Sequence, residues 1–210
     1  MARTAGARNA QFEERRNALI YKARDRLSLQ GSEPPSFREI ALACGVSVAT
    51  LRHYFGTREG LIKSIFEQSL QTGRRHLSST RAPQAASSDF ESGLRQFLQR
   101  VVVGWTEGQV GALHRIGLSE GLRNPATALA YLSDILEPTL QALEQRLRAD
   151  AERGVIVGCD TRHAALMLLS PILLALLHQH DLGGTRCRPL AIPALIDEHV
   201  RVFARAYLPR

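Results

Sequence analysis

The stretch of residues 36–58 constrains the fold more than any other part of this sequence. Ser36 is a good helix N-cap, because its hydroxyl can accept a hydrogen bond from a free backbone N–H, and Glu39 three residues later completes a capping box. Gly45 stands where this helix must end, since glycine takes the left-handed C-cap conformation without strain. Ser47 can then cap a second short helix. Helix, glycine turn and helix together are the pattern of a helix-turn-helix.

The second helix, residues 48–55, divides its side chains between two faces. Leu51 and Phe55 are four residues apart, so they point the same way, into a core. The outward side chains are small, polar or basic, or are aromatic rings with a hydrogen-bonding group: Ala49, Thr50, Arg52, His53 and Tyr54. Such a face fits the major groove of DNA, where base edges and phosphates offer acceptors. On spacing alone, an ordinary helical hairpin in an all-α protein explains the segment equally well.

The segment also resembles the DNA-binding domain of the tetracycline-repressor (TetR/AcrR) family. That pattern runs Thr-hydrophobic-x-Glu-Ile-Ala, Gly-Val-Ser, Thr-Leu-Tyr-x-x-Phe and Lys-Glu-x-Leu. The residues that match it are Ser36, Phe37, Glu39, Ile40, Ala41, Gly45, Val46, Ser47, Thr50, Leu51, Phe55, Arg58, Glu59 and Leu61. The residues that resemble the family's first helix are Leu19, Ile20, Ala23, Leu27 and Gly31. Arg52 replaces the usual tyrosine and Arg58 the usual lysine, and both arginines keep a donor for phosphate.

The motif and the resemblance together predict which residues contact DNA. These residues are Ser36, Ser47, Ala49, Thr50, Arg52, His53, Tyr54 and Arg58. Among them we expect Thr50, Arg52 and His53 to reach base edges in the groove. The others that carry a hydrogen-bond donor, Ser36, Ser47, Tyr54 and Arg58, are predicted to hold phosphates.

Positive charge gathers in the part of the chain that holds this motif. The 210 residues include 27 Lys and Arg against 20 Asp and Glu, a net charge of +7. Residues 1–80 hold 13 basic and 7 acidic residues, a net +6, whereas residues 81–210 hold 14 and 13, a net +1. A domain that binds phosphates requires such an excess, although a chance asymmetry in a basic protein would look the same.

Sequence motifs for catalysis and metal binding are absent. The chain has no Gly-x-Ser-x-Gly, no phosphate-binding loop and no His-Glu-x-x-His, so we expect neither an enzyme with catalytic residues nor a cofactor. Cys44, Cys159 and Cys187 have no metal-ligand spacing, so no metal site is predicted. An odd number of cysteines without a signal peptide indicates reduced thiols in a cytoplasmic protein.

The hydrophobic periodicity predicts an all-α fold of about nine helices. Residues 1–10 are small and basic, and we expect a disordered arm. Residues 11–77 are expected to form the helix-turn-helix DNA-binding domain, with a three-helix head. Residues 78–88, rich in Ser, Ala and Pro, predict a linker loop, and residues 89–210 a helical ligand-binding and dimerisation domain. In that domain Pro138 should kink or split a long helix.

Two C-terminal helices predict a homodimer. Residues 164–177 are almost wholly apolar, interrupted only by Ser170 and Pro171, but are fewer than the ~20 that a membrane span needs. A helix that is apolar all round must be buried on every side, and a chain of this size can hardly surround it alone. The last helix, residues 191–207, adds an apolar stripe, so two copies of both helices would form a four-helix interface about a twofold axis. A monomeric core is the alternative.

The resemblance also implies a small-molecule pocket in the C-terminal domain, for which the sequence offers candidates but no motif. Pockets are usually apolar with a few placed polar groups. The candidates are polar or aromatic residues that stand among apolar ones: Trp105, His114, Arg115, Glu120, Tyr131, Asp134, Met167 and His178. Each of them would also serve as an ordinary core or surface residue.

Together these features predict a transcriptional regulator, which we expect to be a repressor although the sequence does not itself distinguish repression from activation. A homodimer would bind double-stranded DNA at a palindromic operator. A small-molecule effector would release it by favouring dimers whose heads are spaced wrongly for that operator. Two alternatives stay open: a DNA-binding dimer controlled by a protein partner without a small ligand, and a structural helical adaptor. None of these interpretations involves a membrane.

Overall fold

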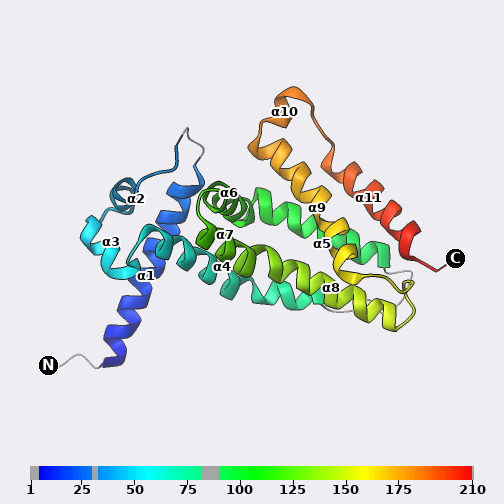
Figure 1. The fold of residues 1–210 in the computed structure, drawn as a ribbon, viewed down its shortest axis with the longest axis horizontal. Helices are drawn as coiled ribbons and strands as arrows, with labels where there is room; N and C mark the ends of the chain where they lie inside the picture. The colour runs from blue at the N-terminus through cyan, green and yellow to red at the C-terminus, as the bar shows by residue number, and fades with distance from the viewer. Residues whose placement is uncertain (1–4, 30–32, 82–89, 210) are drawn as a thin grey trace. The chain divides into compact units, whose positions relative to one another are not determined.

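The computed structural model describes residues 5–29, 33–81 and 90–209, and every regular element in this part of the chain is helical (Figure 1). The all-α fold predicted from the periodicity is thereby confirmed. The α-helices are α1 (Ala5–Ser28), α2 (Phe37–Cys44), α3 (Val48–Phe55), α4 (Arg58–Arg81), α5 (Phe90–Thr106), α6 (Val110–Gly121), α7 (Pro125–Tyr131), α8 (Glu137–Glu152), α9 (Thr161–Leu176), α10 (Gly184–Cys187) and α11 (Ile192–Tyr207). Two π-helical turns, Leu132–Leu136 and Leu177–Asp181, directly follow α7 and α9.

The chain forms two compact units, each made of two separate segments. The first unit comprises Met1–Gln71 and Ala112–Ile135, and the second comprises Thr72–Gly111 and Leu136–Arg210. The first unit therefore contains α1, α2, α3 and the first part of α4, together with most of α6 and all of α7. No local pattern in the sequence places α6 and α7 with the N-terminal helices, because that grouping depends on contacts between distant segments.

Two helices extend further than the sequence suggests. The sequence predicts an arm without regular structure over residues 1–10, but α1 already includes residues 5–10, whose three alanines and one arginine are good helix formers. Likewise α4 continues through residues 78–81 of the predicted linker. The rest of that linker and residues 1–4 lie outside the described part of the chain.

The core of the first unit is built from the predicted apolar stripes. In this unit α1 packs against α2, and α2 packs against α3. The buried side chains from α1 to α4 are Leu19, Ile20, Ala23, Leu27, Ile40, Ala41, Cys44, Leu51, Phe55, Leu61, Ile62, Ile65 and Phe66. Phe12 of α1 is exposed, and its ring stacks on the ring of Tyr54.

Within the same unit, α6 and α7 pack closely at one glycine. A Cβ added at Gly117 would stand 2.0 Å from Cδ2 of Tyr131, so the tyrosine ring lies directly on the backbone of α6. The Tyr131 ring also lies near the ring of Phe66 in α4, with 6.1 Å between the centroids. These contacts hold α6 and α7 against α4.

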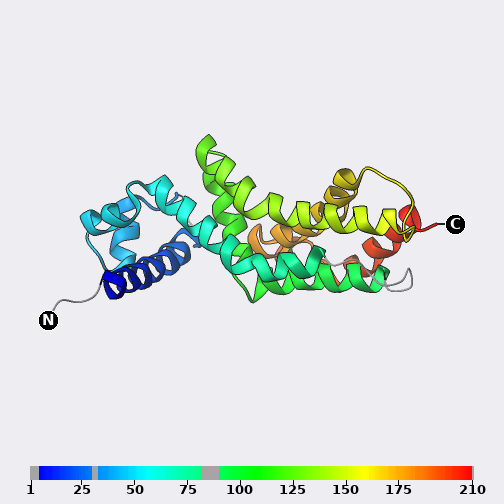
Figure 2. The same ribbon diagram turned by 90° about the horizontal axis from the view of Figure 1, so that it is seen from below.

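In the second unit α5, α8, α9 and α11 pack together (Figure 2). All four contribute side chains to one apolar core. Its buried members include Phe90, Leu94, Phe97, Leu98, Trp105, Leu140, Leu143, Leu147, Ala164, Ala165, Leu168, Leu169, Ile172, Leu176, Ile196, Val200 and Phe203. Asp160 caps α9, because its carboxylate accepts a hydrogen bond from the His163 N–H at 2.9 Å.

Pro138 interrupts a long helix, as the sequence predicts. It stands in the first turn of α8, and the π-helical turn Leu132–Leu136 separates α8 from α7. A proline has no N–H to donate to the carbonyl four residues earlier, so the α-helical hydrogen-bond ladder cannot continue through it. The wider π turn takes up this mismatch.

The segment Thr161–Asp181, which includes α9, is the one described segment that is long and apolar enough to cross a membrane. It is longer than residues 164–177 because the π-helical turn continues it. Core helices pass the same test, and α9 packs against α5, α8 and α11. Its other side is uncovered, since Met167 is 57% and Leu174 66% exposed. We therefore interpret α9 as a core helix with one open apolar stripe.

Candidate DNA-binding surface and candidate effector residues

The helix α2 has the caps that the sequence predicts. The Ser36 hydroxyl accepts a hydrogen bond from the Glu39 N–H (3.3 Å), and the Glu39 carboxylate accepts one from the Ser36 N–H (2.7 Å). At the other end Gly45 has a φ of 73°, and the N–H groups of Gly45 and Val46 each donate to a carbonyl in the last turn of α2 at 3.0 Å. These two bonds form a Schellman motif. The turn that leads into α3 is thus fixed by backbone hydrogen bonds.

Ser47 caps α3 and also orients Thr50. The Thr50 N–H donates to the Ser47 hydroxyl (3.0 Å), and the two hydroxyl oxygens are 2.9 Å apart. Leu51 and Phe55 are buried on the opposite side, which confirms the predicted inward face. Because the two hydroxyl groups already lie within hydrogen-bond distance of each other, a contact with DNA would require little further loss of side-chain freedom.

The outward face of α3 is open to solvent. Ala49, Arg52 and His53 are exposed, and Tyr54 is half-buried. The Tyr54 ring stacks on the ring of Phe12 in α1, with 4.7 Å between centroids, and the His53 ring meets that of Phe12 edge-on at 6.2 Å. No described residue forms an ion pair or hydrogen bond with the guanidinium of Arg52. This side chain is therefore free to contact another molecule.

Arg58, which the sequence predicts to hold a phosphate, is engaged within the protein. Its guanidinium pairs with the Glu120 carboxylate at two points, Nη1–Oε2 (2.5 Å) and Nη2–Oε1 (2.7 Å), and its Nε–H donates to the Pro35 carbonyl (3.1 Å). The Arg58 side chain is 22% exposed and that of Glu120 is 7% exposed. The hydrogen bonds with Glu120 raise the pKa of Arg58, and burial opposes this effect. A phosphate would have to compete with a carboxylate for this guanidinium.

Two supporting side chains were not identified from the sequence. Arg16 of α1 lies over the Phe55 ring (5.6 Å to the centroid) and donates to the Ser64 hydroxyl at 2.9 Å. Phe12, four residues earlier, stacks on Tyr54. Phe12 and Arg16 are four residues apart and therefore lie on one face of α1. This spacing is the one feature of the sequence from which their shared position could be predicted.

The predicted effector residues are divided between the two units. His114, Arg115, Glu120, Tyr131 and Asp134 belong to the first unit, and Trp105, Met167 and His178 belong to the second. In the first unit, Glu120 pairs with Arg58, the Arg115 Nε–H donates to the Ser28 carbonyl (3.3 Å), and Asp134 accepts a hydrogen bond from the Ser133 hydroxyl (2.9 Å).

The three candidates in the second unit lie in different surroundings. Trp105 is buried in the apolar core, whereas Met167 lies on the open stripe of α9, where its Sδ accepts a hydrogen bond from the Tyr207 hydroxyl (3.8 Å). His178 Nδ1 is 2.7 Å from Nε2 of Gln179. The role of all eight residues in effector binding stays a prediction.

His114 and Tyr131 form a buried hydrogen bond between α6 and α7. Nδ1 of His114 lies 2.6 Å from the Tyr131 hydroxyl oxygen. Burial lowers the pKa of His114 to about 4 and raises the pKa of Tyr131 to about 12. Both side chains are therefore uncharged at neutral pH.

We expect His114 to make the protein less stable in mild acid. The unfolded chain takes up a proton near the ordinary pKa of 6.5, whereas the folded protein resists protonation down to about pH 4. The contribution is fully present above pH 6.5 and is lost as the pH falls toward 4, by roughly 3 kcal/mol in all. Urea unfolding should be measured at pH 6.5 and at pH 4 for the wild type and for His114→Gln, whose glutamine does not titrate between these values. The variant should lose less stability than the wild type between the two pH values. Equal losses in the two proteins would contradict this prediction.

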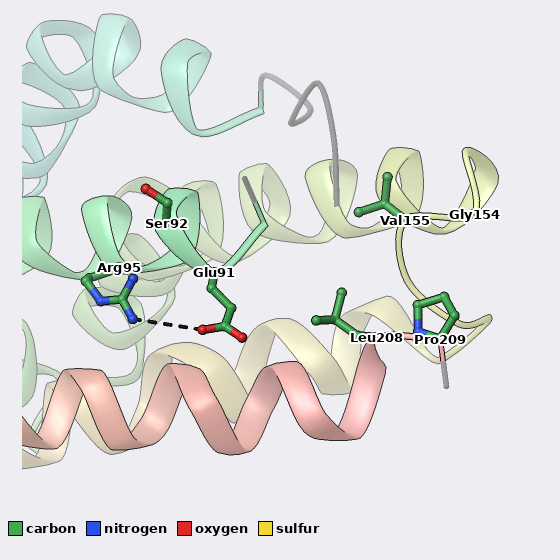
Figure 3. A pocket seen from close by; sticks show the side chains of 7 residues that line it. All are labelled: Glu91, Ser92, Arg95, Gly154, Val155, Leu208 and Pro209. Carbon is green, nitrogen blue, oxygen red and sulfur yellow. Dashed lines mark ion pairs between the residues drawn. The ribbon is translucent and has the colours of Figure 1, made fainter. Parts of the chain in front are cut away.

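The second unit has an open pocket of about 610 Å³ near the start of α5, the turn after α8 and the end of α11 (Figure 3). The residues that line it are Glu91, Ser92, Arg95, Gly154, Val155, Leu208 and Pro209. None of the eight predicted effector residues is among them. Arg95 is already paired with Glu91 (4.0 Å) and Asp197 (2.7 Å), so its charge is balanced within the protein. We assign no ligand to this pocket.

Metal-binding side chains do not cluster in the described part of the chain. No group of three or more His, Cys, Asp or Glu residues there could hold a metal ion. Cys44, Cys159 and Cys187 are free thiols. The site that the geometry defines is thus the capped helix-turn-helix with its open basic face, which is the architecture of a DNA-binding regulator.

Comparisons with known proteins assign this chain to a family. Residues 19–65 match the model of bacterial regulatory proteins of the tetR family. Residues 92–209 match the model of the C-terminal domain of AefR-like transcriptional repressors. The chain therefore belongs to the TetR family of transcriptional regulators, which are DNA-binding proteins and not enzymes.

Individual relatives agree with this assignment. The HTH-type transcriptional regulator UidR of Escherichia coli (strain K12) is 29% identical over 143 residues, which are 67% of this chain and 68% of that protein. A TetR-family regulator from Mesorhizobium loti has a similar fold, with a TM-score of 0.71 and 20% identity over 94% of this chain and 98% of that one. The flavonoid-responsive regulator FrrA gives a TM-score of 0.62 and 27% identity, over 94% and 99% of the two chains.

Proposed function

We propose that this protein is a homodimeric transcriptional repressor that binds a palindromic operator and is released from it by a small-molecule effector. The observation that supports operator binding most directly is the open outward face of α3, a helix held in place by its caps and by buried Leu51 and Phe55. The net charge of +6 over residues 1–80 would attract that surface to phosphates. Repression is supported by the match of residues 92–209 to a repressor domain.

In this proposal the side chains on α3 contact bases, and the helix starts contact phosphates. Thr50, Arg52 and His53 would reach the groove, with Ala49 allowing close approach. Ser36 and Ser47 stand at helix N-termini, where free N–H groups favour an anion. Tyr54 would donate its hydroxyl to the backbone, and Arg58 could do so only by leaving Glu120.

The dimer is proposed from the uncovered apolar stripe of the second unit. Met167 and Leu174 on α9 are exposed, and so is Val202 on α11, which packs beside α9. A second copy of the chain would cover these side chains about a twofold axis. The two copies of α3, the recognition helices of the dimer, would then lie about 34–36 Å apart, or a multiple of that, to meet successive major grooves.

Effector release is proposed from the family and from one relative. FrrA is named as flavonoid-responsive, which supports a small organic molecule as the signal here. Such a molecule lowers operator affinity only as far as it binds better to dimers that are unsuited to the operator. We place the protein in the cytoplasm, where it would meet its DNA.

Selection of bound fragments from random duplex DNA tests this function. The wild-type protein should sediment as a dimer and select a palindrome, because each subunit contacts one half-site. Leu174→Arg should sediment as a monomer and lose the palindrome, since the charge would be buried in the interface. Leu129→Arg changes a similarly exposed leucine of the first unit, so this variant should stay dimeric and should still select the palindrome. A monomeric wild type, or equal binding to selected and random DNA, would reject the proposal.

A further inference from the structure

The second unit buries an arginine whose hydrogen bonds are not all satisfied by its surroundings. Arg146 of α8 is 1% exposed and is the largest side chain that the described structure encloses completely. Its Nε lies 3.7 Å from Oδ2 of Asp150, one turn later in the helix, which is too far for a hydrogen bond. Nε and Nη2 of Arg146 have no hydrogen-bond partner, and neither has Oδ2 of Asp150.

Asp150 alone does not satisfy this guanidinium. Its other oxygen, Oδ1, already accepts a hydrogen bond from Nη2 of Arg153 at 2.7 Å. A shift of about 0.7 Å would let Nε of Arg146 bond to Oδ2 of Asp150, but Nη2 of Arg146 would still lack an acceptor. Buried charged groups are as a rule fully hydrogen-bonded, so an unmet donor here requires an explanation.

Positive charge is in excess around Arg146. Burial lowers the pKa of Arg146, the attraction of Asp150 opposes this, and repulsion by Arg100 of α5 adds to the lowering. Arg146 thus shares the single carboxylate of Asp150 with Arg153, while the guanidinium of Arg100 repels that of Arg146. An additional negative group beside Arg146 would reduce this repulsion and supply the missing acceptor.

Apolar side chains flank Arg146 on the buried side of α8. Leu143 and Leu147 precede and follow it on the buried side of α8, and both belong to the core cluster that also contains Trp105. An aromatic or aliphatic body could pack against such side chains. A charged donor set among apolar residues is the arrangement that recognises an organic anion.

We propose that Arg146 binds the anionic group of the effector, and that the effector is an organic molecule with a carboxylate or a phosphate on an apolar body. The assignment of the bound molecule as effector rests on the proposed function, whereas the anion site rests on the geometry of α8. The planar guanidinium offers Nε–H and Nη2–H to two oxygens in parallel. An uncharged analogue would leave the charge of Arg146 uncompensated, so the site discriminates against it.

Matched small probes test the site on the full-length protein. Sodium benzoate should raise the melting temperature saturably and move the Nε–H resonance of Arg146, which Arg146→Met removes from the spectrum. Benzamide, its uncharged counterpart, should do neither, and sodium chloride at equal ionic strength corrects for general salt effects. Inorganic phosphate in place of benzoate distinguishes the two anion classes. No response to either anion, or an equal response to benzamide, would overturn the proposal.

Variants on α8 locate the response. Arg146→Met should weaken the affinity for the effective anion by at least about tenfold, because the charge-assisted hydrogen bonds are lost. Arg148→Met removes an exposed arginine of the same helix and should leave it unchanged. If Arg146→Met does not fold, Arg146→Lys keeps the charge but not the paired donors and should weaken binding in the same direction. Full affinity in a folded Arg146 variant would refute the assignment.

Operator binding separates this inference from the proposed function. If an anion binds at Arg146 but the protein does not bind DNA, the proposed function is rejected and the anion site stands. If the protein binds its operator specifically, but no anion alters this binding or moves the Arg146 resonance, the anion site is rejected and the proposed function stands. If the proposed function and the anion site are both correct, the anion should weaken operator binding by the wild type and should have less effect on operator binding by Arg146→Lys.

Discussion

Arg52→Ala should lose most of the affinity for the operator while the fold stays intact. The Arg52 side chain lies on the open face of α3, and no described residue pairs with its guanidinium, so its removal breaks no contact within the protein. A guanidinium that donates to a base is worth about 1–3 kcal/mol, and a homodimer loses that contact in both half-sites. We therefore expect the operator affinity to fall roughly 30-fold or more.

Fluorescence anisotropy with the selected operator and with random duplex DNA would measure this loss and show its origin. If Arg52 contacts bases, affinity for the operator should fall much more than affinity for random DNA. If it contacts phosphate, both should fall together, and the dependence on salt should become shallower by about two ions, one for each subunit. Arg148→Ala removes the same charge from α8 and serves as the control. Unchanged operator affinity in Arg52→Ala would remove Arg52 from the interface.

The parts of this fold that the sequence predicts are those encoded within a few residues. The capping box of Ser36 and Glu39, the left-handed Gly45 and the buried pair Leu51 and Phe55 each depend on spacings of at most four residues, and the structure confirms them. The orientation of α3 follows from these local features. Its outward side chains were predicted for the same reason.

Features that depend on distant segments could not be predicted in this way. Arg58 and Glu120 are separated by 62 positions, and nothing near either residue indicates that they meet. The same holds for the packing of Tyr131 on Gly117 and for the grouping of α6 and α7 with the N-terminal helices. For the candidate effector residues the sequence showed polar groups among apolar ones. Such a pattern does not distinguish a ligand contact from an internal hydrogen bond like that of His114.

The pair of Arg58 and Glu120 joins two residues that the sequence assigned to different sites. Arg58 begins α4, two residues after Gly56 ends the recognition helix, and Glu120 lies at the end of α6. Arg115 makes a second link, from α6 to the end of α1 at Ser28. The structure therefore gives Arg58 a role in holding α6 to the DNA-binding helices, in place of or in addition to a contact with phosphate.

A double-mutant cycle decides between these roles. Removing either partner of a largely buried pair leaves the other without its counter-charge, so Arg58→Ala and Glu120→Ala should each lower the free energy of unfolding by about 2–4 kcal/mol. The double variant should be little worse than either single one, giving a coupling energy of at least about 1 kcal/mol. Urea unfolding measures all four proteins. The exposed pair Arg148 and Glu144 on α8 is the control, with an expected coupling below about 0.5 kcal/mol.

DNA binding completes the test, because the two roles predict different patterns. If Arg58 mainly supports the fold, Glu120→Ala frees its guanidinium and removes a nearby negative charge, so affinity for random DNA should rise slightly and its salt dependence should steepen. If Arg58 mainly holds phosphate, Arg58→Ala alone should weaken DNA binding, and Glu120→Ala should leave stability unchanged. We expect the first pattern, because the carboxylate is buried and already bonds to both terminal nitrogens of Arg58. Additive stability losses in the double variant would show that the pair does not hold α6 in place.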